Sequence, residues 1–159
     1  MAVDRCSVRA KRGGGLTGPN PTDRGKAGTK DPGVIATDGI PPAVVRSAAN
    51  VHDTRLFPHP LRLAQTVCAA IGRLHADAGS DSADNRGLCR RDGIQLCIRK
   101  VGEAHGSGLG SIRGVVEHGG AWLLADKRLD RRQDRLSRMT LGLLTIACIL
   151  IVANRVRAF

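Results

Sequence analysis

Residues 73–100 read RLHADAGSDSADNRGLCRRDGIQLCIRK, and this stretch decides the fold class. The segments RLHAD (73–77) and IQLCIRK (94–100) are typical of short strands. The polar segment between them, SDSADNRGLCRRDG (80–93), predicts a helix. A strand, a helix and a second strand in this order predict a βαβ unit with parallel strands. The fold class that we expect is therefore α/β.

The residues before this unit predict further strands. VDRCSVRA (3–10) is compatible with a strand that ends at KRGGG, and GVIATDGIPPAVV (33–45) predicts a hairpin that turns at Asp38 and Gly39. Between them, residues 16–30 predict a turn-rich, basic loop. Pro32 argues against a strand at KDPGV because proline cannot donate to a sheet ladder. A Pro-containing connection and a helix in LRLAQTVCAAIG (61–72) complete this half.

Two helices are expected after the βαβ unit. In residues 111–129, apolar side chains recur with helical spacing and predict an amphipathic helix. Residues 139–153, MTLGLLTIACILIVA, form a run of fifteen uncharged residues, which is shorter than the roughly 18 that a membrane span needs. We expect a buried C-terminal helix there, and a membrane anchor is the alternative. At 159 residues the chain has room for one domain, 1–159.

The charge balance points to a polyanionic partner. The chain has 25 Lys and Arg against 14 Asp and Glu, a formal net charge of +11, and the basic residues occur along its whole length. Neutralising phosphates releases counterions and gives affinity without sequence readout. Nucleic acid is the first candidate and an anionic membrane surface is the second. Aromatic residues make up only 2% of the chain, which disfavours recognition of single strands by base stacking.

The cysteines favour a reducing compartment. The five cysteines, Cys6, Cys68, Cys89, Cys97 and Cys148, include no CxxC pair and no histidine at zinc-finger spacing. This odd set supports neither a disulfide framework nor a zinc site. The N-terminal residues lack the apolar stretch of a signal peptide. We therefore expect a cytoplasmic protein.

Three groups of motifs carry a family resemblance. They are AVDRCSVRAKRGG with LTGPNPTDRGKAGTK near the start, SAANVHD with LHAD in the middle, and HGSGLGSIRGVVEHGGAWLL towards the end. In order and approximate spacing, the chain resembles the catalytic portion of bacterial insertion-sequence transposases of the IS-five type. The resemblance implies a ribonuclease-H-like α/β core, incomplete here and followed by a C-terminal helical segment. It also implies an active site made of two aspartates and a glutamate.

Carried over position by position, the resemblance assigns the site. Asp4 in the VD strand, Asp77 in LHAD and Glu117 in VVE match the three catalytic, metal-binding acids. Arg113, one helical turn before Glu117, is expected to orient that carboxylate or to contact a phosphate. The basic residues expected to contact DNA are Arg9, Lys11, Arg12, Lys30, Arg113 and Arg132.

The reason for three clustered acids is electrostatic. Two carboxylates about 4 Å apart repel by roughly 4 kcal/mol at an effective dielectric constant of 20. A divalent cation relieves this repulsion, and hard oxygen ligands suit Mg²⁺ or Mn²⁺. Two such ions can activate a water or a DNA 3′-hydroxyl and stabilise the leaving oxygen. The expected partners are thus transposon ends and target DNA.

Each candidate also has a simpler reading. Asp4 can be an exposed charge near the N-terminus, and Glu117 a solvated helix position. Asp81 is expected to be a turn residue and Asp53 a helix cap. His75 and His118 are expected to face solvent or to fill gaps, since neither has partners at ligand spacing.

Departures from the family leave the activity open. The chain begins just before the first aspartate, so we expect a shortened first strand and no N-terminal DNA-binding segment. Gly114 stands where relatives usually have Trp, and His118 with Gly119 replaces a more usual Arg-Thr pair. These changes suggest an inactive remnant, or the catalytic half of a split transposase that assembles with an N-terminal half or as a homo-oligomer. A non-catalytic DNA-binding protein or transposition inhibitor is the alternative, and a small membrane-associated protein is a third hypothesis.

Overall fold

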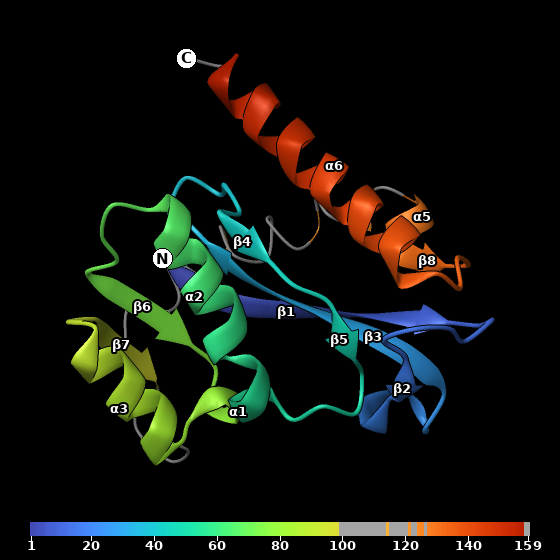
Figure 1. Cartoon of the computed structure of the whole chain (residues 1–159), viewed down its shortest axis with the longest axis horizontal. Helices are drawn as coiled ribbons and strands as arrows, with labels where there is room; N and C mark the ends of the chain where they lie inside the picture. The colour runs from blue at the N-terminus through green and yellow to red at the C-terminus, as the bar shows by residue number, and fades with distance from the viewer. Residues whose placement is uncertain (99–113, 115–120, 122–123, 126, 158–159) are drawn as a thin grey trace.

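A computed structural model describes residues 1–98, 114, 121, 124–125 and 127–157. Within these residues the strands form one eight-stranded mixed sheet, whose central order is β2-β3-β1-β6-β7 (Figure 1). Strands β1 (Ala2–Ala10) and β3 (Ala27–Ile35) are antiparallel, whereas β1, β6 (Arg73–Ala76) and β7 (Gln95–Ile98) run parallel. The short strands β4 (Ala43–Val44) and β5 (Ser47–Ala48) pair with β3, and β8 (Arg131–Arg132) pairs with β1.

The βαβ unit expected from residues 73–100 is confirmed. Helix α3 (Ala83–Arg91) connects β6 to β7, which pair in parallel from Arg73–Gln95 to Ala76–Ile98. Ser82 caps the helix, because its hydroxyl accepts a hydrogen bond from the Asn85 backbone N–H. The predicted helix in 61–72 begins earlier and ends earlier, as α2 (Pro58–Val67), and it follows the short helix α1 (Asp53–Leu56).

The first two long strands are more extensive than expected. β1 covers nine residues and pairs with β3 from Ala2–Ile35 to Arg9–Gly28. The predicted loop at 16–30 contains β2 (Gly18–Pro19) and the single-turn helix η1 (Pro21–Asp23), and its last four residues already belong to β3. The predicted hairpin turn at residues 38–39 is confirmed between β3 and β4.

Strand β3 accommodates Pro32, contrary to the expectation from sequence. On the outer side of β3, β4 pairs with residues 33–34 and β5 pairs with residues 29–30. Pro32 lies between these two partners, and its carbonyl accepts a hydrogen bond from the Val45 backbone N–H at 3.0 Å. The missing proline N–H therefore falls where the ladder changes partners, and no pairing is lost there.

The main core lies between one face of the sheet and the helices α2 and α3. The strands contribute Val34, Leu74 and Ala76 to this core. Helix α2 and the residue before it contribute Phe57, Leu61 and Ala64, and α3 contributes Leu88 and Cys89. Aliphatic residues make up most of this cluster, as the low aromatic content requires. The core fixes β3 and β6 against the same helices, and β1 lies between these two strands.

The prediction of a buried C-terminal helix is wrong. Helix α6 (Ser137–Val156) has twenty residues and projects away from the sheet, with the C-terminus at its outer end (Figure 1). Only Thr140, Leu144 and Ala147 are buried, because a single face contacts Leu129 of α5 (Lys127–Asp130) and its surroundings. The large apolar residues left exposed are Leu136, Met139, Leu141, Ile146, Ile149, Leu150, Val152 and Val156. By length and composition alone, α6 could cross a membrane, a property that core helices of soluble proteins share.

Candidate active site

Asp4 lies on β1, and Asp77 directly follows β6, the parallel neighbour of β1. Ala2 of β1 pairs with His75 of β6, and each aspartate lies two residues further along its strand direction. The backbone remains extended at Asp77, with φ −70° and ψ 154°. Because side chains alternate along a strand, both aspartates belong to the sheet face of Ala2 and His75. Neighbouring strands lie about 4.8 Å apart, so this register brings the two positions together.

A small pocket joins the two aspartates. Its cavity volume is about 20 Å³, and its lining includes Asp4 on β1 and both Asp77 and Ser80 after β6. The other lining residues are Val3, Arg5, Pro32, Asp53, Leu56 and Phe57. A cavity of this size holds about one water-sized particle. The pocket is therefore lined by both aspartates, Asp4 from β1 and Asp77 from the end of β6.

The third predicted acid cannot be placed. Glu117 and Arg113 lie outside the described residues, as does most of the amphipathic helix expected at 111–129. Among the residues that the structure describes, no group of three or more His, Cys, Asp or Glu side chains could hold a metal ion. Of the three predicted acids, the described residues thus include Asp4 and Asp77.

Cys6, two residues after Asp4 on the same strand face, is not available as a thiolate. Burial is the main cause that raises the pKa of Cys6 to about 12, followed by the negative charges of Asp31 and Asp4. The Cys6 side chain consequently stays an uncharged thiol at neutral pH, and the site remains one of oxygen ligands.

Comparison with known proteins identifies the family. Residues 1–152 match the family model described as "Transposase DDE domain". The chain belongs to this transposase family. It is 38% identical over 155 residues to the Burkholderia cepacia protein named "Putative transposase for insertion sequence element IS402", covering 89% of this chain and 70% of that protein.

Solved structures show the fold of this DDE domain. The chain resembles a chain in the cryo-electron microscopy structure of the simian T-cell lymphotropic virus intasome in complex with PP2A regulatory subunit B56 gamma. The TM-score is 0.56 at 11% identity, covering 92% of this chain and 45% of that chain. It also resembles the catalytic core domain of BIV integrase, with a TM-score of 0.47 at 15% identity, covering 93% and 80%. The resemblance to the intasome chain, with its TM-score of 0.56, confirms the expected ribonuclease-H-like α/β fold.

Asp53 lines the pocket of the DDE domain. It is not the helix N-cap that the sequence predicts. The N-cap of α1 is His52, whose ring nitrogen accepts from the Thr54 backbone N–H. Asp53 is the first residue of α1, and its carboxylate pairs with Arg5 and Lys30 at 2.7 and 2.9 Å. Sequence reasoning missed this pairing, although Arg5 directly follows Asp4 and the SAANVHD motif ends at Asp53.

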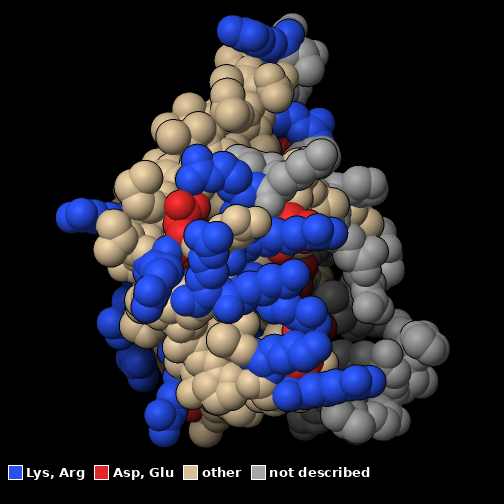
Figure 2. All heavy atoms as spheres, turned by 90° about the vertical axis from the view of Figure 1, so that its right-hand side faces the viewer, with Lys and Arg blue, Asp and Glu red and all other residues tan. Residues whose placement is uncertain are grey.

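The residues expected to contact DNA divide into two groups. Lys11 and Arg12 are exposed, and Arg9 is exposed while paired with Asp23 at 2.7 Å. Figure 2 shows Lys and Arg side chains gathered on the face at the β2 and β8 end of the sheet. The exposed basic residues of these segments, here called the basic patch, are Arg9, Lys11, Arg12, Arg24, Lys26, Arg131 and Arg135.

Lys30 and Arg132, which were also expected to contact DNA, are held by hydrogen bonds within the chain. The Lys30 ammonium donates to Asp53 and to the Val51 carbonyl. Arg132 is 1% exposed, and its guanidinium donates to the carbonyls of Gly15 and Asp134. Their position in the sequence gave no sign of burial, because each is surrounded by polar or basic residues.

Asp81 behaves as the turn residue that the sequence predicts. It follows the single-turn helix η2 (Ala78–Ser80), and its backbone N–H donates to the Ala78 carbonyl at 3.1 Å. Its carboxylate accepts two hydrogen bonds from Arg86 at 2.7 and 2.9 Å.

His75 is expected to make the fold less stable in acid. The residue is 4% exposed, and its Nδ1 atom has no hydrogen-bond partner within the part of the chain that the structure describes. Burial, then the N-terminal ammonium and then Arg73, lowers the pKa of His75 below its ordinary value of 6.5. The unfolded chain therefore binds this proton more readily, so the free energy of unfolding falls as the pH decreases through about 6.5.

The measurement is the urea midpoint at pH 7.5 and 5.5 for the wild type and for His75→Gln. The substitution should flatten the decline in acid, because glutamine does not titrate. Equal declines in the two proteins would show that other groups cause the pH dependence.

Proposed function

We propose that this chain is the catalytic domain of an insertion-sequence transposase of the IS-five type, which cleaves and joins DNA in a reaction that depends on Mg²⁺ or Mn²⁺. One observation carries the proposal: Asp4 on β1 and Asp77 at the end of the adjacent parallel strand β6 line one pocket in a chain that belongs to the transposase DDE domain family. Glu117 is the proposed third acid, from the segment that follows β7.

The donor set fits a hard divalent cation. The described acids supply carboxylate oxygens, the ligands that Mg²⁺ and Mn²⁺ prefer. Asp4, Asp77 and, by proposal, Glu117 would hold the cation. A bound divalent cation supplies a more acidic nucleophile and charge stabilisation for in-line phosphoryl displacement.

The basic patch would bind the DNA and orient it toward the pocket. The basic patch includes Arg9, five residues beyond Asp4 on the same strand, which corresponds to roughly 17 Å along β1. A duplex held on this patch by its phosphates would therefore reach the pocket. Contacts of this kind position DNA without reading its sequence. Specificity for transposon ends is assigned, as part of the proposal, to an N-terminal DNA-binding segment such as the family carries.

The assembly in which this chain acts is also part of what we propose. The match covers 70% of the IS402 relative and 45% of the intasome chain. We propose one catalytic domain over residues 1–159, acting in the cytoplasm as a homo-oligomer or together with an N-terminal transposase half.

The test is DNA nicking by the full chain, alone and mixed with an N-terminal transposase half. Conversion of supercoiled plasmid to open circles is expected with Mg²⁺ or Mn²⁺, and none with EDTA. DNA binding without nicking under both cations, with the half supplied, would contradict a catalytic role and favour a non-catalytic DNA-binding protein.

A further inference from the structure

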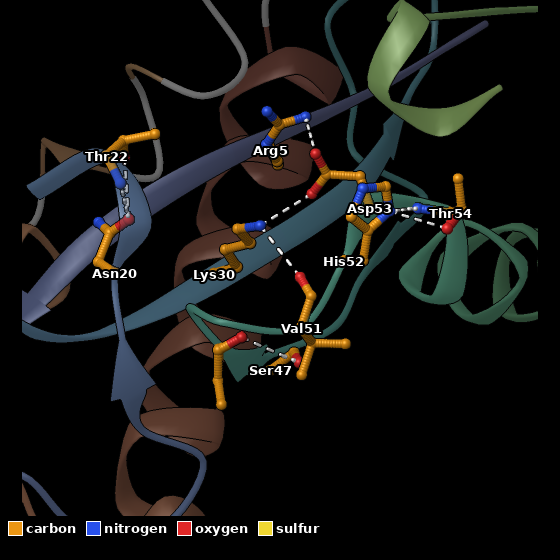
Figure 3. A network of polar contacts seen from close by, with 10 residues as sticks. Arg5, Asn20, Thr22, Lys30, Ser47, Val51, His52, Asp53 and Thr54 are labelled. Atoms are coloured by element: carbon orange, nitrogen blue, oxygen red, sulfur yellow. Dashed lines mark hydrogen bonds and ion pairs between the residues drawn. The ribbon is translucent and has the colours of Figure 1, made fainter. Parts of the chain in front are cut away.

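Three charged side chains form a network beside the pocket (Figure 3). Lys30 of β3 donates to Asp53 Oδ1 at 2.9 Å and to the Val51 carbonyl at 3.1 Å. Arg5 of β1 contacts the other carboxylate oxygen, Asp53 Oδ2, at 2.7 Å through Nη1. The Asp53 carboxylate thus ties the start of α1 to both long strands of the sheet.

The network is a largely buried one. The side chains of Asp53 and Lys30 are 14% and 12% exposed, while that of Arg5 is 35% exposed. Partly desolvated charges are kept in place by their partners, because an unpaired charge in such surroundings is strongly unfavourable. Both oxygens of Asp53 are taken by cations, so this carboxylate is neutralised and does not offer a free ligand to the pocket.

The network also touches the turn that carries Asp77. Gly79, in η2, lies against Asp53: a Cβ atom at Gly79 would be 3.1 Å from Asp53 Oδ2 and 3.8 Å from Arg5 Nη1. Asn85 holds the same turn to α1, because its Nδ2 atom donates to the carbonyls of Ser80 and Thr54 at 2.8 and 3.0 Å. The turn after β6 therefore packs on a carboxylate that is itself fixed by β1 and β3.

We propose that Asp53 is a positioning residue that sets the spacing between Asp4 and Asp77. Asp4 directly precedes Arg5, which Asp53 holds, and Asp77 lies two residues before Gly79, which packs on Asp53. A displacement of the Asp53 carboxylate would thus be transmitted to both metal-binding acids. Ligand positions must be held to about 0.5 Å, and loss of a supporting contact typically lowers metal affinity 10- to 100-fold. This inference rests on the proposed metal-dependent function.

The test measures Mn²⁺ affinity of the full chain by electron paramagnetic resonance of the free ion. The main variant is the double substitution Lys30→Met with Asp53→Asn, which leaves no buried ammonium unpaired. We expect Mn²⁺ binding to weaken 10- to 100-fold while the circular dichroism spectrum and the affinity for plasmid DNA stay unchanged. The matched control, Arg128→Met with Asp134→Asn, removes an ion pair on α5 and its connection to α6, and it should bind Mn²⁺ like the wild type.

A second variant keeps the inference testable if the double variant does not fold. Gly79→Ala leaves every charge in place and pushes on the Asp53 carboxylate, so it should weaken Mn²⁺ binding several-fold. Wild-type Mn²⁺ affinity in Gly79→Ala would overturn the inference, and so would wild-type affinity in a folded double variant. Asp4→Asn and Asp77→Asn are measured in parallel. If they leave Mn²⁺ affinity unchanged, the proposed function itself fails.

Discussion

Replacing Asp31 by Asn should lower the free energy of unfolding by about 3–5 kcal/mol, enough to prevent folding if the domain is marginally stable. The Asp31 and Arg46 side chains are 2% and 0% exposed, and Arg46 donates two hydrogen bonds to the Asp31 carboxylate, one of them at 2.6 Å. Asparagine keeps the shape of the side chain but removes its charge, so the Arg46 cation would remain buried without a counterion.

A second buried guanidinium, that of Arg132, should make the loss of Asp31 more destabilising than the loss of Arg46. Burial, and then the charge of Arg46, lowers the pKa of Arg132, whereas Asp31 raises it. Arg132 thus lies near the Arg46 cation and near two carboxylates, Asp31 and Asp134, which both raise its pKa. Among the residues that the structure describes, the Nη1 atoms of Arg46 and Arg132 find no hydrogen-bond partner. Asp31→Asn leaves Arg46 without its counterion and removes one of the two carboxylates near Arg132, while Arg46→Met leaves the Asp31 carboxylate beside the Arg132 cation. We expect Arg46→Met to cost clearly less than Asp31→Asn.

Urea denaturation of both variants measures this difference, and the thermal midpoint should fall by roughly 6–20 °C for Asp31→Asn. Asp23→Asn is the control, because it removes the same charge from the exposed pair with Arg9 and should shift the urea midpoint far less than Asp31→Asn does. Equal costs for Arg46→Met and Asp31→Asn would show that Arg132 does not share the Asp31 carboxylate.

Local signals in the sequence were sufficient for much of the fold. The βαβ unit and the hairpin turn at residues 38–39 depend on strand patterns, capping and turn chemistry within short segments. Strand β3 could not be predicted through Pro32, because a ladder that changes partners at one residue is a property of the assembled sheet. The exposure of α6 was missed for a similar reason. An apolar run shows that a helix can be buried, but it does not show whether the rest of the fold offers a surface that covers it.

The site was predictable in part, and through resemblance. The motifs VD and LHAD pointed to Asp4 and Asp77, and the register of β1 with β6 explains how residues 73 positions apart come to share a pocket. Nothing local distinguishes Lys30 or Arg132 from the exposed cations of the basic patch. Their burial depends on Asp53 and on backbone carbonyls that are distant in sequence.

Removing either aspartate of the pocket should abolish metal-dependent DNA nicking, with a loss of at least about a hundredfold for Asp4→Asn and for Asp77→Asn. The physical reason is that both carboxylates are proposed to hold the same cation, so each is ineffective without the other. Groups that act as a unit are strongly non-additive. The double variant should therefore be scarcely worse than either single variant, and this is measured as the initial rate of plasmid nicking with Mg²⁺ and with Mn²⁺.

Asp81→Asn provides the matched control, since it removes the same charge only four residues after Asp77. Its carboxylate is held by Arg86 and does not line the pocket, so nicking should stay within about twofold of the wild type. Losses that multiply in the Asp4 and Asp77 double variant would mean that the two acids act independently and do not share a cation. Equal loss in Asp81→Asn would mean that general negative charge in this region, and not the register of β1 with β6, supports the reaction.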